Sequence, residues 1–151
     1  MVTTEEKLKI LFLCTGNSCR SQMGEAWTRS LKGDVIEPYS AGVWPHPVDP
    51  RTVKAMAEVG LYISGSRSKS PMDLADVEFD YVITVCDHAN QTCPVFHAKT
   101  KVVHVGFDDP PMLAESAQDE EEAMAHYRRV RDEIKAFVET LPDALTSSDD
   151  S

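Results

Sequence analysis

A cysteine and an arginine separated by five residues stand near the N-terminus, directly after a short apolar run. The residues between them are mostly small and polar: Thr15, Gly16, Asn17, Ser18 and Cys19. A loop of this composition can curl so that successive backbone N–H groups point inward and bind a tetrahedral oxyanion, aided by the N-terminus of a following helix. Arg20 adds a planar guanidinium that can grip two anion oxygens at once. The pattern predicts an oxyanion-binding loop over residues 15–20, with the Cys14 sulfur as a nucleophile at its base.

The same surroundings favour the ionised form of the Cys14 side chain, because inward amides, a helix end and the Arg20 guanidinium all stabilise a thiolate. Ser21 follows the arginine and is expected either to hydrogen-bond this thiolate or to cap the helix. Asn17 is expected to adopt a left-handed backbone conformation and to tie the loop together. Cys19 is interpreted as a structural residue.

Two further cysteines, Cys86 and Cys93, flank a polar loop that follows another apolar run. A loop this polar can refold at low cost. If Cys86 attacks an adduct on Cys14, Cys93 can resolve the product by thiol exchange. Two buried free thiols are the alternative interpretation. A zinc site of Cys86, His88, Cys93 and His97 is disfavoured, because this ligand spacing matches no usual zinc pattern.

An acidic pair precedes a proline later in the chain. Asp109 stands before Pro110, and the residue before a proline is held in an extended conformation. A carboxyl group held over the oxyanion loop could donate a proton to a leaving oxygen as general acid. Asp108 is the alternative if Asp109 points away, and a simple turn is the non-catalytic interpretation.

Hydrophobic periodicity and turn residues predict the elements that position these groups. Strands are predicted at Lys7–Leu13, Val35–Ser40, Tyr81–Val85 and Lys101–Val105. Helices are predicted at Ser21–Leu31 ending at Gly33, at Pro50–Val59 between Asp49 and Gly60, at Pro71–Asp76, and from Glu115 or Ser116 to Leu141 before Pro142. In these helices Met23, Ala26, Trp27 and Leu31, and then Val53, Met56, Ala57 and Val59, are expected to face inward. The segments 61–70, 87–99 and 106–113 are predicted to be loops.

Alternating strands and helices predict an α/β fold: a single three-layer domain with a four-stranded parallel sheet flanked by helices. In such a sheet the ligand lies beyond the carboxyl ends of the strands, at a topological switch point. Cys14, Cys86 and the Asp109 loop each follow a predicted strand. They are therefore expected to meet at one edge of the sheet.

Length and charge restrict the function further. At 151 residues the chain suits one domain, expected over residues 1–145, with a disordered tail at 146–151. A net charge of −10 argues against binding to nucleic acid. No apolar run is long enough to span a bilayer, and the N-terminus lacks the apolar stretch of a signal peptide. We expect a cytoplasmic monomer whose cysteines do chemistry rather than form a disulfide scaffold.

Three motifs together resemble the thioredoxin-coupled arsenate reductases of the low-molecular-weight tyrosine phosphatase superfamily. They are CTGNSCRSQMGE at 14–25, Cys86-x6-Cys93, and GFDDP at 106–110, and the resemblance runs from about Lys7 to Leu141. It implies a low-molecular-weight phosphatase-like fold and a role in arsenic detoxification. By this resemblance Cys14 is the nucleophile on arsenate, Arg20 the oxyanion binder, Asp109 the general acid and Ser21 the thiolate stabiliser.

The resemblance also implies the fate of the other sulfurs. Cys86 attacks the arseno-cysteine and releases arsenite, Cys93 closes a disulfide with Cys86, and reduced thioredoxin reduces that disulfide. No tightly bound cofactor is implied, and glutaredoxin with glutathione is the alternative electron donor. Some relatives hold a potassium ion beside the loop. Here Asn17, Glu25 and Ser40 match that site, but Arg67 and Lys69 stand where Thr and Asp are expected, so no metal is predicted.

Two other functions are open on the sequence alone. A tyrosine phosphatase needs only the loop and Asp109, but the resemblance leads us to expect aromatic residues after the Asp-Pro pair, where this chain has Pro111 and Met112. We therefore expect only a weak phosphatase side activity. A non-catalytic oxyanion or arsenite sensor is the other alternative. It is disfavoured because this sequence shows no DNA-binding motif.

Overall fold

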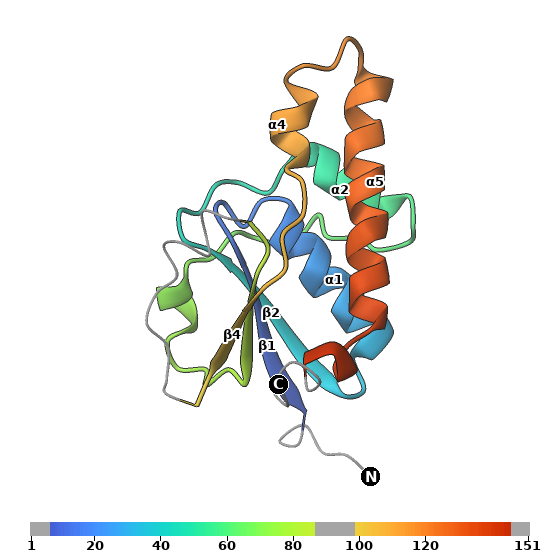
Figure 1. The fold of residues 1–151 in the computed structure, drawn as a ribbon. Coiled ribbons are helices and arrows are strands. Elements are labelled where there is room, and N and C mark those ends of the chain that lie inside the picture. Colours follow the sequence, from blue (N-terminus) through green and yellow to red (C-terminus); the bar gives the residue numbers. More distant parts are fainter. Residues whose placement is uncertain (1–6, 87–98, 146–151) are drawn as a thin grey trace.

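Four parallel strands form the sheet at the centre of the molecule (Figure 1). The computed structural model describes residues 7–86 and 99–145. The strands are β1 (Leu8–Cys14), β2 (Ile36–Gly42), β3 (Tyr81–Thr84) and β4 (Lys101–His104), in the order β2-β1-β3-β4. Every neighbouring pair is parallel. The predicted four-stranded parallel sheet is confirmed.

Strand burial follows position in the sheet. In β1 the residues from Ile10 to Leu13 are at most 1% exposed, and all four residues of β3 are buried. Central parallel strands are buried on both faces, and their sequences are therefore continuous apolar runs. The edge strand β4 is mostly exposed. The core therefore lies around β1 and β3, directly below the Cys14 loop.

The helices are α1 (Arg20–Lys32), α2 (Pro50–Ala57), α4 (Pro110–Ala114) and α5 (Glu120–Glu139), with a short 3-10 helix η2 (Pro71–Leu74). In Figure 1 α1, α2 and α5 lie together to the right of the sheet and η2 lies to its left. The indole N–H of Trp27 donates to the backbone carbonyl of Arg131 at 3.1 Å, which fixes α1 against α5. Among the described residues, no helix combines the length and apolar character needed to cross a bilayer.

The strand order changes direction at β1. The chain leaves β1 through α1 to reach β2 on one side, and then crosses to β3 on the other side. This is the topological switch point at which ligands bind in open parallel sheets. Cys14 is the last residue of β1, so the predicted nucleophile occupies the switch point.

The region after β4 differs from the sequence prediction. Residues 106–113 were predicted to be a loop, but Pro110 and Pro111 begin helix α4, with Asp109 at its N-cap. The last helix was predicted from Glu115 or Ser116 but begins at Glu120, because the Asp119 side chain accepts the N–H of Glu122 at 2.8 Å. A proline at the first helical position and a carboxylate N-cap are both strong start signals. Helix α4 therefore lies within the segment predicted to be a loop, and helix α5 begins later than predicted.

The predicted inward faces are partly wrong. Val59 and Leu31 are each 37% exposed, and Val53 and Ala57 are only half-buried. The buried residues of α2 are Thr52, Ala55 and Met56. Helix α2 ends at Ala57, so Val59 lies beyond it and does not follow the helical period.

Glu58 at the end of α2 holds α5 through two arginines. Its carboxylate accepts from Arg128 at 2.9 Å and from Arg131 at 3.1 Å. The hydrogen bonds from Arg128 are the main reason why the pKa of Glu58 lies below its usual value. A carboxylate with a lowered folded-state pKa stabilises the protein above its unfolded-state pKa, and that contribution disappears as the pH falls through the folded-state value.

We therefore expect Glu58→Gln to lower the free energy of unfolding at pH 7 by roughly 1 kcal/mol. The difference from the original protein should shrink as the pH falls through the lowered folded-state pKa of Glu58, because the protonated side chain no longer forms the ion pairs. Urea unfolding at pH 7 and at pH 3 measures this. Glu78→Gln, at an exposed site, is the matched control and should change little. An undiminished Glu58→Gln difference at pH 3 would rule out the ion-pair explanation.

Candidate active site

Hydrogen bonds to its carbonyl oxygens hold the loop after Cys14 in a curled conformation. The segment after β2 donates four of them: Val43 N to Cys14 O at 3.0 Å, Trp44 N to Thr15 O at 2.7 Å, His46 N to Gly16 O at 2.8 Å, and Asp49 N to Ser18 O at 3.0 Å. The hydroxyl of Ser68 donates to the Asn17 carbonyl at 2.9 Å. In a trans peptide the N–H of the next residue points opposite to the carbonyl. The outward carbonyls therefore turn the amides of residues 15–19 toward the interior, as an oxyanion cradle requires.

Two backbone features allow the close approach of this loop to β2. Asn17 has a φ of 52°, the left-handed conformation predicted for it. Gly42, the last residue of β2, has no room for a side chain, because a Cβ there would lie 2.6 Å from the Asn17 nitrogen. Asn tolerates the left-handed conformation better than most residues. These two positions explain how the loop can be both tightly curled and packed against the sheet.

The Cys14 sulfur lies at the base of the cradle and is surrounded by hydrogen-bonding groups. Its Sγ lies 3.1 Å from the Ser21 hydroxyl and accepts from the Asn17 N–H at 3.3 Å. Cys14 is only 4% exposed. The contact expected between Ser21 and the sulfur is therefore present. Hydrogen-bond donors and the N-terminus of α1 around a sulfur favour the thiolate.

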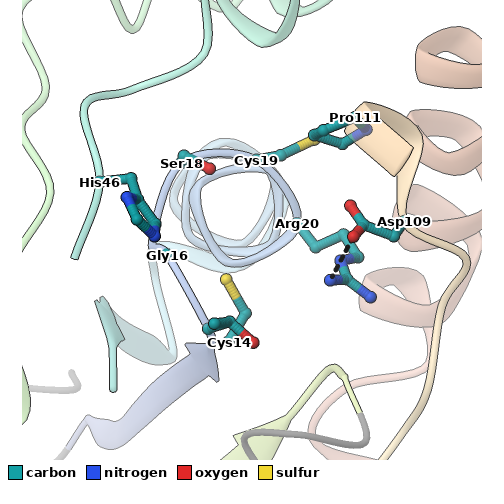
Figure 2. Close-up of a pocket in the computed structure, with 9 residues that line it drawn as sticks. Cys14, Gly16, Ser18, Cys19, Arg20, His46, Asp109 and Pro111 are labelled. Atoms are coloured by element: carbon teal, nitrogen blue, oxygen red, sulfur yellow. Dashed lines mark ion pairs between the residues drawn. The ribbon is translucent and has the colours of Figure 1, made fainter. Parts of the chain in front are cut away.

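Arg20 and Asp109 lie next to each other on the side of the cradle away from His46 (Figure 2). The buried Arg20 guanidinium donates to the Phe107 carbonyl at 2.8 Å and lies 3.7 Å from the Asp109 carboxylate. Asp108 instead pairs with Arg129 on α5 at 3.0 Å. Of the two acidic candidates, Asp109 is the one that reaches the cradle, and it does so from an extended backbone before Pro110.

Cys86 lies beside the cradle. Its Sγ is 3.2 Å from the Thr15 hydroxyl, two residues past the end of β3. It lines a hollow that shares Arg20 and Asp109 with the hollow above Cys14. The expectation that the ends of β1, β3 and β4 bring these groups to one sheet edge is met. Cys93, like His88 and His97 of the disfavoured zinc site, lies outside the described residues.

Cys19 is a buried thiol at the end of the cradle loop. Burial raises the pKa of the Cys19 thiol far above its ordinary value. It therefore stays protonated at neutral pH and is a poor nucleophile, although it lines the hollow above Cys14. This agrees with its interpretation as a structural residue.

Two side chains at the site have no counterpart in the sequence prediction. His46 lies over Gly16 on the side of the hollow away from Asp109 (Figure 2). The buried side chain of Gln22 contacts the back of the cradle. Gln22 belongs to the motif at 14–25, but its position in that motif does not indicate which groups its side chain contacts. His46 sits between two prolines, a pattern that indicates only a loop.

Glu25, Ser40 and Asn17, considered above as a possible cation site, contact protein groups. Glu25 accepts from the Ser40 hydroxyl and from Arg29, each at 2.5 Å. The Asn17 side-chain oxygen accepts from the Lys69 N–H at 2.8 Å. Within residues 7–86 and 99–145, no cluster of three or more His, Cys, Asp or Glu residues could hold a metal ion.

The family model for the low molecular weight phosphotyrosine protein phosphatase matches residues 9–150. An arsenate reductase of Halalkalibacterium halodurans is 47% identical over 142 residues, covering 89% of this chain and 97% of that protein. One of Bacillus subtilis is 46% identical over 139 residues, covering 87% and 95%. A solved structure described as an arsenate reductase in the phosphate binding state is 31% identical, with a TM-score of 0.66, and covers 89% of this chain and 95% of its own.

Proposed function

The chain belongs to the low molecular weight phosphotyrosine protein phosphatase family, and we propose that within this family it is an arsenate reductase. The proposal is supported by relatives of that name that match nearly their full length. The observation that carries it is the second sulfur at the cradle, since Cys86 contacts Thr15 of the loop. Phosphate-ester hydrolysis at such a cradle needs one sulfur only, whereas reduction of an oxyanion needs a second thiol to take part.

In the first step the Cys14 thiolate attacks the arsenic of arsenate, whose oxygens lie against the inward amides and the Arg20 guanidinium. One arsenate oxygen leaves as water, and Asp109 supplies a proton to it. The product holds pentavalent arsenic bonded to sulfur. Preorganised amides and a guanidinium stabilise the charge that develops on the oxygens. As the negative charge of the Cys14 sulfur moves into the new sulfur–arsenic bond, Ser21 gives up its hydrogen bond to that sulfur.

In the second step the Cys86 thiolate attacks the sulfur of Cys14. The sulfur–arsenic bond breaks, its electron pair stays on arsenic, and arsenite leaves with trivalent arsenic. A Cys14–Cys86 disulfide remains, so two thiols have been oxidised for a two-electron reduction of arsenic. Cys93 then attacks Cys86, which frees Cys14 and forms a Cys86–Cys93 disulfide.

Reduced thioredoxin is the proposed electron donor. Its dithiol reduces the Cys86–Cys93 disulfide and returns the protein to its starting state. Glutaredoxin with glutathione is the alternative donor. We propose that the protein acts as a cytoplasmic monomer in arsenic detoxification, without a tightly bound cofactor.

The test is a coupled assay with arsenate, thioredoxin, thioredoxin reductase and NADPH. We expect NADPH oxidation that depends on arsenate and on this protein, with one arsenite formed per NADPH. Replacing thioredoxin with glutaredoxin and glutathione identifies the donor. With arsenate and every donor present, an absence of NADPH oxidation would contradict the proposed function. It would favour an oxyanion sensor if arsenate still bound.

Phosphatase activity should be a minor property of the same cradle. Met112 follows the Asp-Pro pair and is 59% exposed, and it offers no aromatic ring against which a phosphotyrosine could stack. Hydrolysis of p-nitrophenyl phosphate should therefore be slow, while still requiring Cys14.

A further inference from the structure

The hydrogen bonds behind Cys14 form a chain whose direction is fixed by a backbone group. The Lys69 backbone N–H can only donate, and it donates to the Asn17 side-chain oxygen at 2.8 Å. The Asn17 amide nitrogen therefore faces Ser21, and it donates to the Ser21 hydroxyl oxygen at 2.7 Å. With its oxygen accepting from Asn17, Ser21 directs its own proton to the Cys14 sulfur at 3.1 Å. This direction suits a thiolate, which accepts and cannot donate.

Gln22 reinforces the same direction from the next position of α1. Gln22 is only 2% exposed. Its amide nitrogen lies 3.2 Å from the Asn17 side-chain oxygen, 3.1 Å from the Asn17 carbonyl oxygen and 3.2 Å from the Arg67 carbonyl oxygen. All three partners are acceptors, so only the nitrogen end of the Gln22 amide can face them. Gln22 thus contacts both the side-chain oxygen and the backbone carbonyl of Asn17, and it joins the cradle to the segment 67–69.

We propose that Gln22 is a positioning residue for the reaction. It fixes the Asn17 side chain so that Ser21 donates to Cys14, and in this way it favours the thiolate without touching it. The proposal rests on the proposed function only in taking Cys14 as the reacting sulfur. Because Lys69 also holds Asn17, the loss of Gln22 weakens this arrangement rather than abolishing it.

The test measures alkylation of Cys14 by iodoacetamide between pH 4 and pH 9, with the Cys14 peptide quantified by mass spectrometry. Gln22→Met removes the donors at similar side-chain length. Loss of about one net hydrogen bond should move the midpoint of the alkylation profile upward by about 0.7 pH unit. Gln22→Glu keeps the size of the side chain but cannot donate when ionised, so it should move the midpoint further. Gln118→Met, at an exposed site between α4 and α5, is the matched control.

A second pair of variants separates positioning from a merely structural role. If Gln22 acts through Ser21, Gln22→Met should add little to the shift that Ser21→Ala causes alone. An equal shift in both backgrounds, or no shift in either Gln22 variant, would overturn the proposal. Alkylation requires neither arsenate nor thioredoxin. A failure of arsenate reduction with the expected profiles would therefore reject the proposed function while leaving the role of Gln22 intact.

Discussion

Replacing Cys14 with serine is expected to abolish arsenate reduction while leaving the cradle able to bind an oxyanion. The inward amides and Arg20 are held by the 43–49 segment and by Phe107, and neither depends on the sulfur. A serine hydroxyl is not ionised at neutral pH and cannot form the disulfide that carries the two electrons. Loss of a covalent nucleophile costs on the order of 10⁴-fold or more in turnover. The coupled NADPH assay measures this loss.

Binding by the Cys14→Ser protein is the necessary control. Calorimetric titration with phosphate and with arsenate should give affinities near those of the original protein, since the anion contacts remain. Thermal unfolding checks that the variant is folded. Retained thioredoxin-dependent turnover in this variant would contradict the assignment of Cys14 as the nucleophile.

Replacing Cys86 with serine is expected to stop the reaction after the first covalent step. Cys86 lies against the cradle loop, with its Sγ 3.2 Å from the Thr15 hydroxyl. Without it, the described residues place no other reactive sulfur to displace arsenic from Cys14, since the Cys19 thiol stays protonated. Multiple turnover should fall at least about 10³-fold, the scale for a missing group in a concerted catalytic unit. Mass spectrometry after a single exposure to arsenate should find the Cys86–Cys93 disulfide in the original protein and no internal disulfide in the variant.

Hydrolysis of p-nitrophenyl phosphate separates the two cysteines. That reaction uses Cys14, Arg20 and Asp109 only, so the Cys86→Ser protein should retain it and the Cys14→Ser protein should lose it. A Cys86→Ser protein with full multiple-turnover arsenate reduction would show that arsenite release does not pass through this sulfur.

Features that depend on neighbours along the chain could be predicted from the residues alone. The apolar runs of β1 and β3 identify buried parallel strands, and their ends place Cys14 and Cys86 at one sheet edge. The left-handed Asn17 was predicted from residue types within one loop, whereas Ser21 was left open between a contact with Cys14 and a helix cap until the structure showed the contact. Local periodicity and conformational preference encode such features directly.

Contacts between groups from distant parts of the chain could not be predicted in this way and became visible in the folded protein. Arg129 on α5 draws Asp108 away and leaves Asp109 at the cradle. The 43–49 segment turns the loop amides inward, and Lys69 with Gln22 fixes the direction of the hydrogen bonds that end on Cys14. A hydrogen bond between residues tens of positions apart depends on how the packed elements bring them together, and no local sequence pattern encodes that geometry.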